Sequence, residues 1–211
     1  LGARYSERRE VLALFGYLVA TPLPDAAEIA WAREVCRGEL RDAAFPAYTI
    51  DCATRLIAWN ASFPRLLGVG PGDSLLARLS RELLLVSWFD PGSPLARLVI
   101  EPESFLPALI RALRYELRQL HAEDWYAPWM ARLQELPLFR HYWAQVDREP
   151  EPASAARSLV TVRLAVPRVG PLQFRLAAEA FTRDARFRLV YLLPADADTL
   201  RQCAAWADEA P

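Results

Sequence analysis

The chain has 211 residues, 53% of them apolar and 11% aromatic, and a net charge of −1. This length and composition fit one globular domain with an appendage, or two small domains, and exclude a disordered chain. The near-zero charge excludes a general basic field for nucleic acid or anionic lipid. No apolar run approaches the roughly 20 residues that span a bilayer, so we expect a soluble protein without membrane segments.

The three cysteines, Cys36, Cys52 and Cys203, lie far apart and form no CxxC pair. This spacing argues against a disulfide framework or a zinc site and favours reduced thiols in a cytoplasmic protein. The chain begins at Leu1 and not at a methionine, so we expect a fragment from which an upstream part is missing.

Two helices are predicted before the first strand. The stretch YSERREVLALFGYLV places four apolar residues on one helical face: Val11, Leu14, Phe15 and Leu18. After the stop TPLP, Asp25 and Glu28 form an Asp-type capping box. The helix that follows is expected to run to about Arg41.

A compact strand–turn–strand unit follows. Residues 47–51 and 55–59 are rich in Tyr, Thr, Ile and Trp and are joined by a short polar turn, which predicts two paired strands. Asn60 is placed to cap a short helix that Gly68 terminates.

Residues 69–147 are predicted to be mostly helical. The segment ESFLPALIRALRYELRQL has an apolar face and an opposite basic face of Arg111, Arg114 and Arg118. That basic face is either solvated or a partner for a ligand carboxylate. Two acids near a helix start, Glu123 and Asp124, are expected to be solvated.

The C-terminal part predicts three strands, over residues 158–166, 171–181 and 186–193, and a last helix around 198–207. Two N-terminal and three C-terminal strands with helices between them predict an α+β fold. Its core is one five-stranded antiparallel sheet covered by a helical insert, with N-terminal helices. We expect two units, a helical coupling or dimerisation segment at 1–44 and a ligand-binding domain at 45–211.

Residues 47–68, AYTIDCATRLIAWNASFPRLLG, resemble the start of a PAS domain. Further blocks follow in family order: LLLVSWFDP, PLFRHYWAQVD, VGPLQFRL and FRLVYLLPAD. Over roughly residues 45–196 the chain resembles the MmyB-like ligand-binding domain, the PAS-like half of many bacterial helix-turn-helix regulators of the XRE type. One departure is GSPLARLVIEPESF after Asp90-Pro91, where the family usually continues into an Arg-rich helix with a Trp.

The resemblance implies a non-enzymatic sensor that binds an apolar effector, such as a fatty acid, and acts as a homodimer. It also implies that DNA is contacted only through an N-terminal helix-turn-helix domain that this chain lacks. A pocket between the sheet and the helical insert would be lined by apolar and aromatic side chains. The candidates are Trp59, Phe63, Leu67, Trp88, Phe105, Leu109, Leu113, Trp129, Leu133, Phe139, Trp143, Phe174, Leu176 and Tyr191.

Other interpretations stay open. A well-packed domain with no ligand could serve only for dimerisation, and any one aromatic residue could simply pack in the core. An enzyme has little support, because the sequence has no GxSxG, HExxH or P-loop motif. A haem ligand role for His121 or His141 is disfavoured against an ordinary histidine, and Cys52 reads as an inert thiol. We expect no cofactor.

Overall fold

A computed structural model describes residues 7, 11, 12, 14, 15, 20–118, 120–147 and 160–209. Its centre is a five-stranded antiparallel sheet in the order β2-β1-β5-β4-β3. The strands are β1 (Ala47–Asp51), β2 (Leu56–Trp59), β3 (Thr161–Val166), β4 (Gly170–Ala180) and β5 (Phe187–Pro194). Because β1 pairs with both β2 and β5, the N-terminal hairpin and the C-terminal strands form one sheet, as the sequence predicts.

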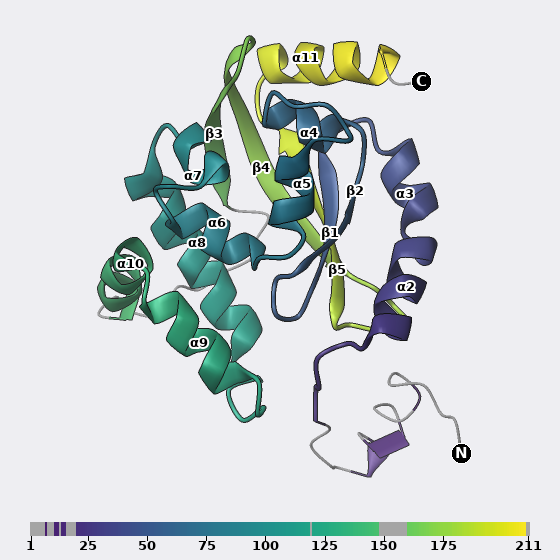
Figure 1. Cartoon of the computed structure of the whole chain (residues 1–211), viewed down its shortest axis with the longest axis vertical. Helices are drawn as coiled ribbons and strands as arrows, with labels where there is room; N and C mark the ends of the chain where they lie inside the picture. The colour runs from purple at the N-terminus through teal and green to yellow at the C-terminus, as the bar shows by residue number, and fades with distance from the viewer. Residues whose placement is uncertain are drawn as a thin grey trace.

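Helices surround this sheet and account for most of the remaining chain (Figure 1). The first two are α2 (Ala26–Val35) and α3 (Arg37–Asp42), and the last is α11 (Ala197–Asp208). The helices between β2 and β3, here called the insert, are α4 (Ser62–Leu66), α5 (Ser74–Leu79), α6 (Leu84–Phe89), α7 (Pro94–Leu98), α8 (Pro102–Leu117), α9 (Tyr126–Gln134) and α10 (Pro137–Asp147). None of the helices in the described ranges is both long and apolar enough to cross a bilayer.

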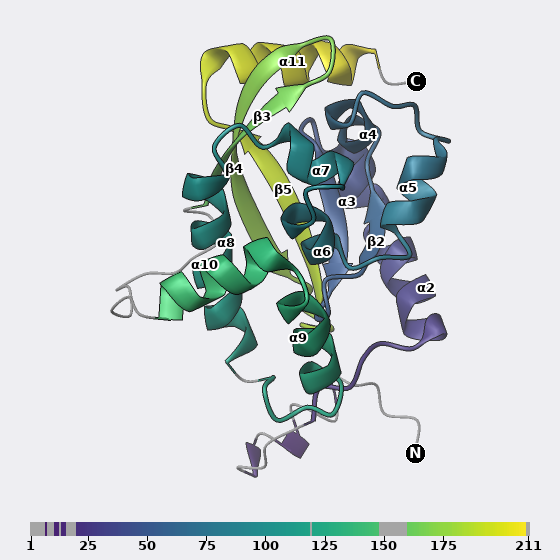
Figure 2. The same ribbon diagram turned by 60° about the vertical axis from the view of Figure 1, so that its left-hand side comes forward.

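The two faces of the sheet pack against different helical layers, which Figure 1 and Figure 2 show from two sides. Phe174 of β4 and Leu192 of β5 point toward the insert and belong to the main core. Leu189 of β5 points the other way and packs with Cys36 and Leu40, at the start and in the middle of α3. In β1 and β5 this alternation buries residues on both faces of the sheet, and α2 and α3 pack on the face opposite the insert, whereas β3 is buried on the insert side alone.

The turn between β1 and β2 is organised by Asp51. Its buried carboxylate accepts the backbone N–H groups of Ala53 (3.0 Å) and Arg55 (2.9 Å) and also binds the Arg55 side chain. Thr54 adopts φ 66°, a left-handed conformation that is unusual for a β-branched residue. The aspartate at this position is thus explained by the turn that it holds.

Asn60 joins the same hairpin to the insert. Its Oδ1 accepts the N–H groups of Ala47 (3.0 Å) and Phe63 (3.2 Å), and its Nδ2 donates to the carbonyls of Ala43 and Phe45. Ala61 stands at the N-cap position of α4, and Asn60, one residue earlier, satisfies an N–H of its first turn through Phe63 and also anchors the beginning of β1. The helix ends at Leu66, and Gly68, which follows the C-cap residue Leu67, adopts a φ of 68° that suits glycine.

The structure corrects two of the predictions, one on a helix and one on a surface charge. The helix predicted from Asp25 to Arg41 keeps its capping box with Glu28 but breaks in a turn at Cys36, which separates α2 from α3. Glu123 is not a solvated charge, because its carboxylate accepts the backbone N–H of Thr21 at 2.7 Å. The helix predicted in the stretch YSERREVLALFGYLV lies mostly outside the described residues.

Candidate functional site

Thirteen of the fourteen residues predicted to bind a ligand meet in one apolar region between the sheet and the insert. Eleven of them belong to the main buried core, and Trp59 and Trp143 pack against it half-buried. The fourteenth, Tyr191, lies on the opposite face with the second, smaller core. The reason is the alternation along β5, which sends Val190 and Leu192 toward the insert and Tyr191 away from it.

Aromatic rings connect the helices of the insert within this region. The ring centroids of Trp88 and Phe105 lie 5.2 Å apart, which joins α6 to α8. Phe139 of α10 contacts Phe89 at 5.1 Å and stacks on Trp143 at 5.3 Å. These separations lie in the range of favourable ring pairs, so the layer is built from aromatic contacts rather than from aliphatic packing alone.

Trp129 ties α9 to the β1–β2 turn. Its indole N–H donates to the carbonyl of Ala53 at 2.8 Å, and its ring lies 6.1 Å from that of Trp125. Trp125 in turn donates to the carbonyl of Thr21 at 2.8 Å. A continuous path of contacts therefore runs from a predicted ligand-binding residue to the segment that precedes α2.

Few polar groups border the apolar region. Among the described residues, the buried hydroxyls of Thr54 and Ser87 have no hydrogen-bond partner. Arg114 of α8 lies over the Trp143 ring, 5.3 Å from its centroid, and forms an ion pair of 2.7 Å with Asp147. Arg114, one of the three arginines on the predicted basic face, therefore lies against a predicted ligand-binding residue.

A second ion pair crosses from the sheet to the insert. Arg188 of β5 binds Glu116 of α8, and less than a fifth of either side chain is exposed. Neither residue was predicted from the sequence, because neither stands out from the other charges of its segment.

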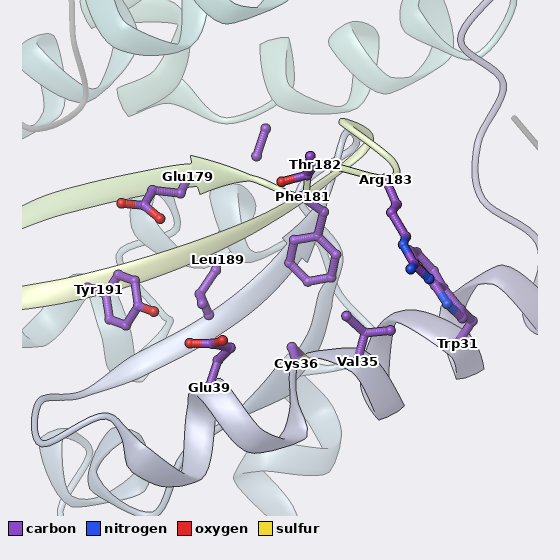
Figure 3. A pocket seen from close by; sticks show the side chains of 11 residues that line it. Trp31, Val35, Cys36, Glu39, Glu179, Phe181, Thr182, Arg183, Leu189 and Tyr191 are labelled. Atoms are coloured by element: carbon purple, nitrogen blue, oxygen red, sulfur yellow. The ribbon is translucent and has the colours of Figure 1, made fainter. Parts of the chain in front are cut away.

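An open groove lies on the opposite face of the sheet, between the α2–α3 segment and the ends of β4 and β5 (Figure 3). Its volume is about 350 Å³. Phe181, Leu189 and Val35 form its apolar middle, and Glu39 and Glu179 carry carboxylates at one end. Of the residues that line this groove, Tyr191 alone is among the fourteen predicted ligand-binding residues.

A buried cluster of charges fixes α2 and the segment before it to the sheet. Arg186, only 2% exposed, binds both Asp184 (2.8 Å) and Glu28 of α2 (2.5 Å) and also donates to the carbonyl of Pro22 (3.2 Å). Arg55 likewise donates to the carbonyl of Pro24 at 3.0 Å. Residues 21–28 are therefore held by the sheet on one side and, through Thr21, by the loop between α8 and α9 on the other.

The remaining candidates give no sign of catalytic or metal chemistry. His121 and His141 are exposed, and the described residues contain no group of His, Cys, Asp and Glu side chains that could hold a metal ion. The three cysteines are free and buried, and burial raises the pKa of the Cys52 thiol to about 12. A thiol with so high a pKa is neutral and unreactive at neutral pH.

A model of the MmyB-like transcription regulator ligand binding domain matches residues 40–205, which is most of the chain. Comparison with curated proteins gives no match. The matched range includes the whole sheet, the insert and all fourteen predicted ligand-binding residues.

Proposed function

The chain belongs to the family of MmyB-like transcription regulator ligand-binding domains, and we propose that it is a sensor for an apolar small molecule such as a fatty acid. The effector lies in the apolar region between the sheet and the insert. The observation that carries this proposal is the meeting of thirteen predicted ligand-binding residues in that one region. Membership of a ligand-binding family is what makes this region a candidate site and not only a core.

Burial of the acyl chain supplies the affinity. Each methylene that leaves water contributes about 0.8 kcal/mol, so a dodecanoate chain gains roughly 9 kcal/mol before the costs of ordering. This gain is enough for a micromolar dissociation constant without any polar motif, in keeping with the apolar lining. To admit the acyl chain, the aromatic contacts of α6, α8 and α10 must separate.

The carboxylate of the effector pairs with Arg114. This guanidinium lies against Trp143 at the edge of the region and is about one-third exposed, so a ligand head group can reach it from solvent. Its present partner, Asp147, is 61% exposed and can be displaced at small cost. The buried hydroxyls of Thr54 and Ser87 are further polar groups for a ligand to satisfy.

Residues 1–44 act as a coupling and dimerisation segment in this proposal. Support comes from Thr21, which is bonded to Glu123 and Trp125 of the insert, while the carbonyl of Pro22 accepts a bond from Arg186 in the turn before β5. A ligand that shifts the insert against the sheet therefore strains both attachments.

Homodimer formation and a cytoplasmic location complete the proposal, and DNA contact belongs to a separate helix-turn-helix domain. Leu14 and Phe15 support a dimer contact through the N-terminal segment, since both expose large apolar side chains, 85% and 74% respectively. Sedimentation of Leu14→Glu beside the unaltered chain tests the contact, with a monomer expected for the variant alone.

Calorimetric titration of dodecanoate into delipidated protein tests the ligand site. We expect micromolar binding by the unaltered chain and about tenfold weaker binding by Arg114→Gln, because a charge-assisted contact is lost. Arg118→Gln is the matched control, because Arg118 is an exposed arginine at the C-cap of α8, four residues after Arg114, and this variant should leave the affinity unchanged.

Two results would contradict separate parts of the proposal. Equal affinities for the two arginine variants would remove Arg114 as the carboxylate partner. Absence of binding for saturated carboxylic acids of 8 to 16 carbons would remove the fatty-acid class and favour a ligand-free interaction module.

A further inference from the structure

The groove on the α2–α3 face has the shape and size of a small-molecule site. Its volume of about 350 Å³ lies within the usual range for such sites, roughly 300–1,000 Å³. Phe181, Leu189 and Val35 supply an apolar middle, with room for a short hydrocarbon body. This groove is separated from the proposed effector site by the thickness of the sheet.

One end of the groove is negatively charged. Figure 3 shows Glu39 from α3 and Glu179 from β4 at this end, together with Tyr191. Both glutamates are exposed, and within the described ranges neither side chain takes part in an ion pair or hydrogen bond. Burial raises the pKa of the Tyr191 phenol, and the charges of Glu39 and Glu179 raise it further, so both carboxylates act on the same hydroxyl.

The other end of the groove carries a positive side chain, Arg183. Arg183 and Trp31 lie there, away from the two glutamates (Figure 3). A cation is therefore attracted to one end only, and an apolar body attached to it follows the aromatic and aliphatic middle.

We propose that this groove binds a small organic cation with an apolar body, such as a primary alkylammonium. The ammonium lies between Glu39 and Glu179 and donates to their carboxylates and to the Tyr191 hydroxyl. The alkyl chain lies against Phe181 and Leu189. This site is independent of the proposed effector site, because it uses the opposite face of the sheet and the opposite ligand charge.

Hexylammonium chloride is the probe, with 1-hexanol as its neutral counterpart. Titration into the full chain, followed by NMR shifts of the amides at residues 179–183, should give a Kd of about 1 mM for a ligand of this size. Hexanol should bind at least tenfold more weakly. Glu39→Gln and Glu179→Gln should each weaken hexylammonium binding about tenfold, because a charged hydrogen-bond acceptor is lost.

Glu135→Gln is the control, since Glu135 is an exposed glutamate at the end of α9 outside the groove, and it should leave hexylammonium binding unchanged. Equal binding of hexanol and hexylammonium, or unchanged binding by the double variant Glu39→Gln/Glu179→Gln, would overturn the proposal. The proposal would also be overturned if a second copy of the chain covered the groove. Light scattering would then show a dimer, and that dimer would not bind hexylammonium. Dodecanoate binding separates this site from the effector site, because the glutamate variants should leave it unaltered.

Discussion

Replacing Arg186 with methionine should lower the free energy of unfolding by about 3–5 kcal/mol. The guanidinium is 2% exposed and holds Asp184, Glu28 and the carbonyl of Pro22. Burial alone would lower the pKa of Arg186, but its hydrogen bonds to Asp184 and Glu28 outweigh burial and raise it. Methionine fills similar space but leaves two carboxylates close together without their cation, which is where the loss arises.

Urea and thermal unfolding followed by circular dichroism at pH 7 measure this loss. For a chain of this length, each kcal/mol shifts Tm by roughly 2–4 °C, so the expected fall is about 6–20 °C. Arg201→Met is the control, because Arg201 and its partner Asp198 are both more than 70% exposed and their pair should contribute less than about 1 kcal/mol. If both variants lost the same small amount, a stabilising role for the buried cluster would be refuted.

Three further changes have expected outcomes. Burial raises the pKa of Cys52 to about 12 and that of Cys203 to about 11, which favours the neutral thiol in the folded state. A thiol reagent at pH 8 should therefore label neither cysteine until urea unfolds the chain. The free energy of unfolding should fall as pH rises from 9 toward these values, because the unfolded chain then loses the thiol protons first. Rapid labelling of the native chain would contradict this. Arg168→Asn should raise the free energy of unfolding in urea by roughly 0.5–1 kcal/mol, because Arg168 is exposed at φ 66° and asparagine tolerates that conformation better. An unchanged or lower urea midpoint would contradict this prediction. Trp125→Phe should remove the hydrogen bond to the Thr21 carbonyl, which is worth about 1 kcal/mol. Limited proteolysis near residue 21 should then be about fivefold faster than in the unaltered chain. Equal cleavage rates would show that this bond does not hold the segment.

Most of the fold could be predicted from local patterns. The alternation of Leu172, Phe174 and Leu176 marks β4 as a half-buried strand, and Asn60 and Gly68 mark the two ends of α4. These signals work because strand alternation and helix capping depend on residues within a few positions of one another. The break at Cys36 was not predicted, since the residues around it continue a helical pattern.

The candidate site could be predicted only in part. Aromatic and aliphatic residues of the insert converge as expected, because helix faces and strand parity send them to one layer. Tyr191 was placed wrongly with them, since the sequence shows that β5 alternates but not which set of residues faces the insert. The contact of Glu123 with Thr21 joins residues 102 positions apart, and that of Arg186 with Glu28 joins residues 158 positions apart. No local sequence pattern predicts contacts over such separations.

The groove beside α2 and α3 was missed for a related reason. Glu39 and Glu179 look like ordinary surface charges in their own segments, and only the packing of α3 against the ends of β4 and β5 brings them together. A site formed by exposed residues from distant elements leaves no periodic signal in the sequence.

Native mass spectrometry of the purified chain, set against its denatured mass, tests the central claim most directly. The account predicts a stoichiometric adduct that is lost on denaturation and that lipid extraction identifies as a long-chain carboxylic acid, or one-to-one uptake of added dodecanoate by a chain purified without ligand. A native mass equal to that of the bare chain, unchanged after addition of carboxylic acids of 8 to 16 carbons, would contradict it.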